Sequence, residues 1–218
     1  MAMSYVVQRR EEERERRRQE ILTAAEHLYA RRGWDAVTMD QIARQARLSR
    51  ALLYVYFRDK DDVLLAISEL AMSDLRRRFA IAVQSRSVGI DKVEAVGRAY
   101  VEWALAAPHR FDACARFQAR PGATSTPEPD GTLQSCQAAG DAVLAEVAGA
   151  VVVGLTDGSI SPAVGDPAVF AITLWGCTHG VIQIAMTKGE ELARFGLKAE
   201  ALYDNAFCAL RLAMTPKN

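Results

Sequence analysis

The sequence predicts an all-α protein: a three-helix N-terminal unit, then a C-terminal antiparallel bundle, with about nine helices in total. Apolar residues recur at three- and four-residue spacing along most of the chain, as they do in amphipathic helices. Capping residues, prolines and glycines separate these segments. No alternating β-branched run is long enough to predict a sheet. We therefore expect two helical domains, residues 1–60 and 61–218.

The composition fits a soluble globular protein, and the charge is unevenly distributed. Half of the 218 residues are hydrophobic and a quarter are charged, the usual balance for a folded chain. The formal net charge is zero, but residues 1–60 hold 13 Lys and Arg against 9 Asp and Glu, and residues 61–218 hold 14 against 18. The two parts therefore carry +4 and −4, a modest excess that favours phosphate binding near the N-terminus.

The cysteines indicate neither a metal centre nor secretion. They are widely spaced without a CxxC pair, and no signal peptide is apparent at the N-terminus. We therefore expect no metal, no cofactor, and four small buried residues in a reduced, cytoplasmic compartment. These residues are Cys114, Cys136, Cys177 and Cys208.

The N-terminal unit begins with a long helical pattern. Residues 9–20 are a mixed arginine and glutamate run, which predicts an exposed helical extension supported by opposite charges four residues apart. Contact with phosphate is the alternative for this run. An apolar stripe then covers residues 21–29, and Gly33 is well placed to end the helix.

Two short helices joined by a tight turn follow. Thr38 and Gln41 predict a capping box at the start of the first. Ser49 predicts the N-cap of the second, which Leu53 and Phe57 anchor to its neighbours. The buried face of the first short helix is expected to consist of Ile42, Ala43 and Ala46.

The rest of the chain predicts six more helices. Residues 120–131 contain three prolines and two glycines and predict a loop. The helices are expected at about 61–84, 91–106, 109–119, 132–155, 166–187 and 198–213.

One of these segments is unusually apolar. Residues 168–186 carry no formal charge and are nearly long enough to span a bilayer. Their polar residues and glycines make a poor lipid-facing helix, so we expect burial in the bundle or between subunits and no membrane association. These residues are Thr173, Gly176, Thr178, His179, Gly180 and Gln183.

Residues 38–60 carry the strongest functional signal. A short helix, a tight turn and a second helix suit a trihelical unit that presents the second helix to a DNA major groove. Tyr54 and Tyr56 stand where a structural helix favours aliphatic or charged residues, and Arg50, Arg58 and Lys60 flank them. Packing against the core is the alternative for Tyr54.

With the preceding helix, these residues resemble the N-terminal domain of the tetracycline-repressor (TetR) family. The resemblance implies a homodimeric DNA-binding transcriptional regulator, most simply a repressor, whose C-terminal domain binds a small molecule. The matching residues are Thr38, Ile42, Ala43, Ala46, Leu48, Ser49, Leu53, Tyr54, Tyr56, Phe57 and Lys60.

The resemblance also assigns roles in binding double-stranded DNA. Thr38, Tyr56 and Lys60 match positions that contact phosphate. Arg50 could donate two hydrogen bonds to guanine, whereas apolar neighbours could only contact thymine methyl groups or exclude water. The positions that match the groove-facing residues are Arg50, Ala51, Leu52, Tyr54 and Val55.

Four positions depart from the usual family residues. Arg47 stands where the turn usually has glycine, so a left-handed backbone there would cost roughly 1 kcal/mol. Ala51, Leu52 and Val55 replace other usual residues, and no relative's operator sequence can therefore be borrowed.

The C-terminal part is expected to sense a ligand and to dimerise. TetR-like proteins pair through their last two helices, here 166–187 and 198–213. Residues 175–180 are similar to a Trp-x-x-x-His-Gly signature found in one group of these domains. A small hydrophobic or aromatic effector is expected among the central helices, although packing is the alternative for each residue. A place at the dimer axis is a further alternative for Trp175 and His179. The predicted lining is Met72, Phe79, Trp103, Phe111, Phe117, Trp175 and His179.

These expectations combine into a mechanism. The dimer reads two half-sites of a palindromic operator, and a ligand that selects a conformer with the wrong spacing releases the DNA. The helix at residues 61–84 links the two domains and is predicted to transmit this change.

An enzyme is disfavoured because Cys177 and His179, two residues apart on a helix, point to different faces. A helical adaptor without DNA binding is the other alternative.

Overall fold

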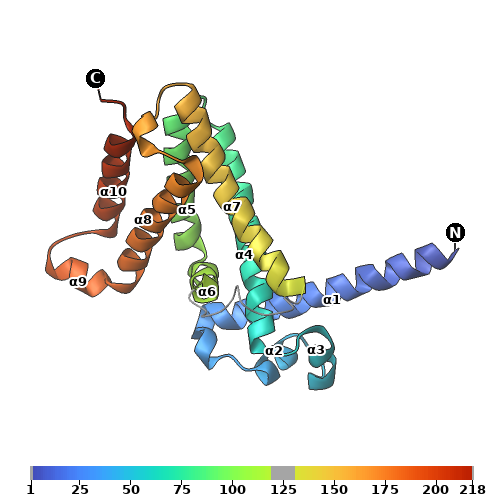
Figure 1. The fold of residues 1–218 in the computed structure, drawn as a ribbon. Helices are drawn as coiled ribbons and strands as arrows, with labels where there is room; N and C mark the ends of the chain where they lie inside the picture. Colours follow the sequence, from blue (N-terminus) through green and yellow to red (C-terminus); the bar gives the residue numbers. More distant parts are fainter. Residues whose placement is uncertain (1, 119–130, 218) are drawn as a thin grey trace. The chain divides into compact units, whose positions relative to one another are not determined.

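A computed structural model describes residues 2–118 and 131–217, and the regular elements in this part of the chain are all helical (Figure 1). The predicted all-α class is confirmed. The described residues form ten α-helices, against about nine predicted, because a short helix lies between the last two predicted ones. The elements are α1 (Ala2–Arg32), η1 (Trp34–Ala36), α2 (Met39–Gln45), α3 (Arg50–Tyr56), α4 (Lys60–Gln84), α5 (Gly89–Ala106), α6 (Pro108–Gln118), α7 (Gly131–Thr156), η2 (Pro162–Val164), α8 (Pro167–Thr187), α9 (Gly189–Arg194) and α10 (Ala199–Met214).

The helix boundaries follow the predicted signals. The charged run and the apolar stripe form one uninterrupted helix, α1. Gly33 follows its end with φ 74°, a left-handed conformation that glycine adopts without steric cost. The predicted loop at 120–131 lies outside the described residues, except that Gly131 begins α7.

The chain divides into two compact units, residues 1–71 with 108–136, and residues 72–107 with 137–218. Helices α4 and α7 each contribute residues to both units. Neither unit ends at residue 60, and the division into domains 1–60 and 61–218 stays a prediction.

The core of the first unit joins the three N-terminal helices to the start of α4 and to α6. Helix α1 packs against α2 and α6, and α2 packs against α3. The predicted anchors Leu53 and Phe57 are buried, and of the predicted buried face of α2, Ile42 and Ala43 are buried whereas Ala46 is half-buried. The hydroxyl of Ser68 donates to the carbonyl oxygens of Leu64 and Ala113 at 2.9 and 3.1 Å, so α4 and α6 are joined by a satisfied polar contact in an apolar core.

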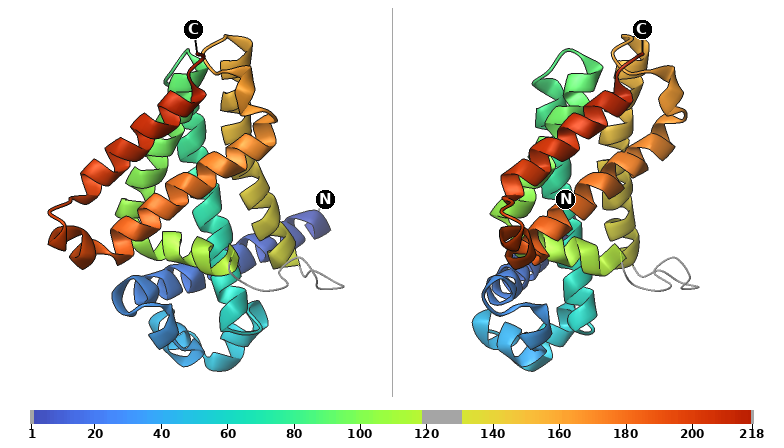
Figure 2. Two further views of the ribbon diagram at one scale, coloured as in Figure 1. Left: turned by 60° about the vertical axis from the view of Figure 1, so that its left-hand side comes forward. Right: turned by 90° about the vertical axis from the view of Figure 1, so that its left-hand side faces the viewer.

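In the second unit, α5, α8 and α10 pack against one another (Figure 2). Arg211 of α10 donates to Asp91 and Glu94 of α5, each at 2.8 Å. At the start of α5, the backbone comes so close to α7 that a β-carbon on Gly89 would lie 2.1 Å from the Gly154 nitrogen. Only glycine fits this approach.

Two helices, α7 and α8, are long and apolar enough to cross a membrane on length and composition alone. Core helices of soluble proteins pass the same test, so two such helices are weak evidence for a membrane span. Within their apolar windows only 28% and 22% of the residues are buried in the chain.

The prediction that all four cysteines are buried is wrong for two of them. Cys114 and Cys136 are buried, and burial raises the pKa of both thiols to about 12. Cys177 of α8 and Cys208 of α10 are exposed, because each lies on the side of its helix that faces away from the unit's core.

Candidate functional site

The helix-turn-helix is fixed by caps at both ends of its turn. Thr38 accepts from the Gln41 backbone nitrogen at 3.3 Å, and the Gln41 side chain accepts from the Thr38 nitrogen at 2.9 Å, so the predicted capping box is present. Ser49 caps α3 by accepting from the Leu52 nitrogen at 3.2 Å. These bonds satisfy backbone donors that would otherwise have no partner at the helix starts.

Arg47 takes the predicted left-handed conformation in the turn, with φ 56°. The Leu48 nitrogen donates to the Ala43 carbonyl oxygen at 2.8 Å, which closes the end of α2 in the manner of a Schellman motif. Glycine usually occupies this position because a side chain adds strain. The turn therefore adopts this conformation although position 47 holds arginine and not glycine.

One side of α3 is core and the other is open. Leu53 is fully buried, whereas Val55 is 68% exposed and Tyr54 42% exposed. Several large apolar side chains exposed on one helix face indicate a binding surface, because burial against a partner would stabilise them. The exposed residues of α3 are Arg50, Ala51, Leu52, Tyr54 and Val55, and Tyr56 is half-buried.

Two basic residues, Arg50 at the start of α3 and Lys60 at the start of α4, lie over aromatic rings and contact oxygen atoms. Arg50 lies over the Tyr54 ring at 5.6 Å and pairs with Asp40 at 3.2 Å. Lys60 lies over the Trp34 ring at 5.1 Å, and its ammonium is 3.4 Å from the Asp35 carbonyl oxygen. Such cation–π contacts orient a charge while leaving it accessible to an anion.

A charged network from α6 holds the segment beneath Lys60. Arg116 donates to both carboxylate oxygens of Asp35 at 3.0 and 2.9 Å, and to Asp112 at 2.8 Å. Asp112 also accepts from the Tyr29 hydroxyl at 2.6 Å. Burial, together with this bond to a carboxylate, raises the pKa of Tyr29 well above its usual value, so the phenol stays a hydrogen-bond donor at neutral pH.

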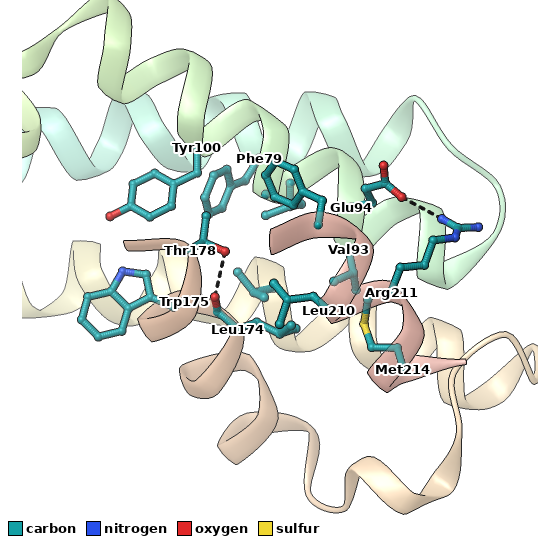
Figure 3. A pocket seen from close by; sticks show the side chains of 14 residues that line it. Phe79, Val93, Glu94, Tyr100, Leu174, Trp175, Thr178, Leu210, Arg211 and Met214 are labelled. Carbon is teal, nitrogen blue, oxygen red and sulfur yellow. Dashed lines mark hydrogen bonds and ion pairs between the residues drawn. The ribbon is translucent and has the colours of Figure 1, made fainter. Parts of the chain in front are cut away.

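A small apolar cavity of about 40 Å³ lies in the second unit between α5, α8 and α10 (Figure 3). Phe79, Tyr100, Trp175 and Phe207 supply aromatic surface to it. The Glu94–Arg211 ion pair stands at one end (Figure 3). The other lining residues are Val93, Val96, Gly97, Val147, Leu174, Thr178, Leu210 and Met214.

The structure brings only part of the predicted ligand-binding set to this cavity. Trp175 lines it, as does Phe79, whereas Trp103 and His179 do not. Phe111 and Phe117 are buried in the first unit, on α6. The ligand-binding role of all of these residues stays a prediction.

His179 and Trp103 contact polar partners beside the cavity. His179 Nδ1 is 2.8 Å from the hydroxyl of Tyr100, which lines the cavity. Burial lowers the pKa of the His179 imidazole, which favours its neutral form. Trp103 donates from Nε1 to Asp74 at 3.2 Å. Polar atoms of both side chains thus have hydrogen-bond partners, as buried polar groups in a packed interior usually do.

Sequence reasoning missed the α10 side of the cavity. We assigned that helix to dimerisation alone, but Phe207, Leu210, Arg211 and Met214 face the cavity. The available signal was the spacing of Phe207, Leu210 and Met214, which marks an inward apolar stripe. Among the described residues, no group of three His, Cys, Asp or Glu side chains could hold a metal ion.

Two family models match the chain. Residues 21–67 match the bacterial regulatory proteins of the tetR family, and residues 93–210 match the tetracyclin repressor-like C-terminal domain. The chain belongs to the TetR family. The resemblance of residues 38–60 to this family is therefore confirmed, and the matched C-terminal region contains Trp175 and most of the residues that line the cavity.

Two characterised regulators are similar over part of this TetR-family chain. The transcriptional regulator HbdR of Aromatoleum sp. (strain CIB) is 48% identical over 45 residues, which are 21% of this chain and 20% of HbdR. The transcriptional repressor Rv1474c of Mycobacterium tuberculosis is 30% identical over 94 residues, 43% of each protein. The chain thus matches less than half the length of either relative.

Solved structures share the fold over most of the chain. A Rhodococcus sp. RHA1 protein of unknown function has a TM-score of 0.74 at 24% identity, covering 92% of this chain and 95% of its own. FadR of Bacillus subtilis, in complex with stearoyl-CoA, has a TM-score of 0.68 at 16% identity, covering 90% and 98%. AibR, in complex with isovaleryl-CoA and operator DNA, has a TM-score of 0.61 at 19% identity, covering 88% and 96%.

Proposed function

We propose that this TetR-family chain is a ligand-responsive, DNA-binding transcriptional regulator. In its simplest form it is a homodimeric repressor that a small hydrophobic effector releases from a palindromic operator. The observation that carries the proposal is the exposed face of α3. Leu52, Tyr54 and Val55 are open on a short helix whose opposite side is fixed in the core through Leu53. A DNA groove covers such a face.

The chemistry of each exposed residue suggests its part in binding. Thr38, Tyr56 and Lys60 stand around α3 as donors for phosphate, which fixes position on the duplex. Arg50 can read guanine, although it must first exchange its ion pair with Asp40. Ala51, Leu52 and Val55 can discriminate only through thymine methyl groups and excluded water.

Binding to DNA is tested by gel-shift titration against duplexes from the neighbouring promoter at physiological salt. We expect Tyr54→Ala and Lys60→Ala to lose affinity by at least tenfold while far-UV circular dichroism stays that of the wild type. Val152→Ala, on an exposed position of α7, is the matched control and should bind normally. Wild-type protein that binds no duplex above non-specific levels would contradict the proposal and favour a helical adaptor.

Dimerisation is proposed to use the open faces of α8 and α10. Val169 and Ile172 on α8 and Leu212 on α10 are more than half exposed in the single chain. Two copies of these faces can form a self-complementary four-helix interface, as a twofold dimer requires. The exposed thiols of Cys177 and Cys208 lie on the same two helices.

Thiol labelling tests this interface. In the dimer, Cys177 and Cys208 should become protected, and their labelling rate should rise as the protein is diluted. The buried Cys114 and Cys136 are internal controls that react only after denaturation. Labelling of Cys177 and Cys208 that is fast at every concentration would contradict dimerisation through these helices.

The effector is proposed to enter the cavity under α10. At about 40 Å³ the cavity is far below the several hundred Å³ of ordinary ligand sites, so the described conformation is closed. A ligand that opens it shifts the population toward another conformer. The apolar lining favours a hydrophobic ligand, and acyl-CoA in FadR and AibR makes an acyl group a reasonable probe.

Two glycine variants test this entry site. A β-carbon on Gly97 would lie 2.7 Å from the Phe207 ring, whereas none of the surroundings lies within 4 Å of one on Gly149. Gly97→Ala should therefore weaken the release of DNA by an acyl thioester or a free fatty acid, and Gly149→Ala should leave it unchanged. Equal release by both variants would exclude this cavity as the entry site.

A further inference from the structure

Helix α1 extends well beyond the core that it helps to form. From Val7 onward, where its side chains are described, residues 7–16 are exposed and the first fully buried residue is Ile21. At 1.5 Å per residue, this exposed stretch is about 15 Å long. Helices in water are marginal unless tertiary packing or side-chain pairs support them. Ion pairs of Arg16 with Glu13 and Glu20, at 2.6 and 3.0 Å, support this one.

The extension and α3 together line an open groove of about 830 Å³ in the first unit. Val55 and Tyr56 form the α3 side of it. The α1 side consists of Arg9, Arg10, Glu12, Glu13, Arg14 and Arg16. We refer to this concavity as the α1–α3 groove. It is continuous with the exposed face of α3 through Val55, which belongs to both.

The charges of the α1–α3 groove favour an anion. Four arginines and two glutamates line it, which gives a net charge of +2. Glu13 is already paired with Arg16, and Glu12 accepts a hydrogen bond from Gln8 at 3.1 Å. Among the described residues, Arg9, Arg10 and Arg14 take part in no ion pair. Their guanidinium groups are therefore available for bidentate hydrogen bonds.

We propose that the α1–α3 groove binds the sugar-phosphate backbone of duplex DNA next to the bases that α3 reads. The operator contact would then extend beyond each half-site through Arg9, Arg10 and Arg14. This inference rests on the proposed DNA-binding function. Duplex DNA is favoured over an acidic protein because Tyr56, at the other wall of the groove, is one of the residues proposed above to donate to phosphate.

A helix that only faces solvent could carry the same charges as α1, but it would add nothing to the affinity for DNA. A backbone contact adds affinity that depends on the length of the duplex and not on its flanking sequence. It also adds released counterions, about 0.9 in the slope of log K against log salt for each phosphate neutralised. Both quantities can be measured with one pair of duplexes.

The test uses the full-length protein and an operator that nuclease protection has located. One duplex ends at the palindromic core, and the other carries about 8 bp of unrelated sequence at each end, which is most of a helical turn. The triple variant Arg9→Gln, Arg10→Gln, Arg14→Gln removes the three arginines. The control variant Arg194→Gln, Lys198→Gln, Lys217→Gln makes the same charge change at exposed positions of the other compact unit.

We expect wild type and the control variant to bind the extended duplex at least tenfold more tightly than the core. The triple variant should bind both duplexes alike, and its salt slope on the extended duplex should fall by about 2.7 per protomer, for three lost phosphate contacts. Circular dichroism should show all three proteins folded.

Three results would overturn the inference. Wild type that binds core and extended duplexes equally would show that the groove contacts no DNA. An equal loss of DNA affinity in the triple and control variants would show that the effect depends only on the net charge of the protein. Wild type that binds no operator would overturn the proposed function and this inference with it, a result distinct from the first two.

Discussion

Arg116 and Asp35 form a bidentate ion pair, in which each terminal guanidinium nitrogen donates to a different carboxylate oxygen, at 3.0 and 2.9 Å. The two residues are 81 positions apart in sequence. Asp35 follows Trp34, whose ring supports Lys60. A residue of α6 thus restrains the segment that orients a proposed phosphate contact.

Loss of this pair should weaken DNA binding without unfolding the protein. We expect Arg116→Ala to reduce operator affinity roughly two- to fivefold, the range for an exposed pair, because η1 and Lys60 become less well oriented. Arg116→Lys should lose less, since it keeps the charge. A double-mutant cycle with Asp35→Asn, read out by fluorescence anisotropy, measures the coupling. Strictly additive effects would mean that the pair does not orient Lys60.

Tyr29 should contribute to stability through its hydroxyl. Tyr29 is 3% exposed and donates to Asp112 at 2.6 Å. Hydrogen bonds to charged groups contribute about 1.5–3 kcal/mol, so Tyr29→Phe should lower the free energy of unfolding by roughly that amount in urea denaturation. Tyr54→Phe, at a residue that is 42% exposed, is a matched control and should change little. A loss no larger than the control's would show that water replaces the bond.

The turn residue Arg47 should be replaceable with a gain in stability. Its left-handed φ of 56° costs a residue with a β-carbon roughly 1 kcal/mol relative to glycine. Arg47→Gly should therefore raise the free energy of unfolding by up to about 1 kcal/mol, measured by thermal or urea denaturation. Arg47→Ala keeps the β-carbon and should give no gain. Equal stability of the two variants would contradict the strain.

The contact between α5 and α7 should tolerate no side chain at its centre. A β-carbon on Gly89 would lie 2.1 Å from backbone, and one on Gly154 would lie 2.4 Å from the Ile160 side chain. Gly89→Ala should destabilise by about 1–3 kcal/mol, because overpacking forces the backbone to shift. Gly154→Ala should cost less, since a side chain can move. Gly149→Ala, in open surroundings, serves as the control in urea denaturation.

Local signals in the sequence predicted the helix-turn-helix unit well. The cap at Thr38, the cap at Ser49 and the strain at Arg47 depend on near neighbours in the chain, so each could be derived from a few residues. The match of residues 21–67 to the family confirms the unit as a whole.

The cavity was harder to predict because its walls come from distant segments. Trp103 and Phe111 look equally suited to a pocket in the sequence, yet Trp103 satisfies Asp74 and Phe111 lies in the other unit. Tyr100 and Phe207 line the cavity because α5 and α10 meet. That long-range pairing leaves no signal in a single sequence, since aromatic residues on an apolar stripe read simply as core.

The environment of His179 should make stability depend on pH. Burial lowers the pKa of His179 in the folded chain, so the unfolded chain binds a proton first as pH falls below the ordinary histidine value of about 6.5. Because the unfolded state then holds more protons, the free energy of unfolding decreases as pH falls from there toward the lowered value. Above about pH 6.5 this contribution is fully present.

Urea denaturation at pH 7.5 and pH 5.5 should show a larger loss of unfolding free energy for wild type than for His179→Gln, which cannot titrate. Tyr100→Phe, which removes the hydroxyl 2.8 Å from Nδ1, should keep the pH dependence, since burial rather than this hydroxyl causes the shift. Parallel losses in wild type and His179→Gln would assign the pH dependence to other groups.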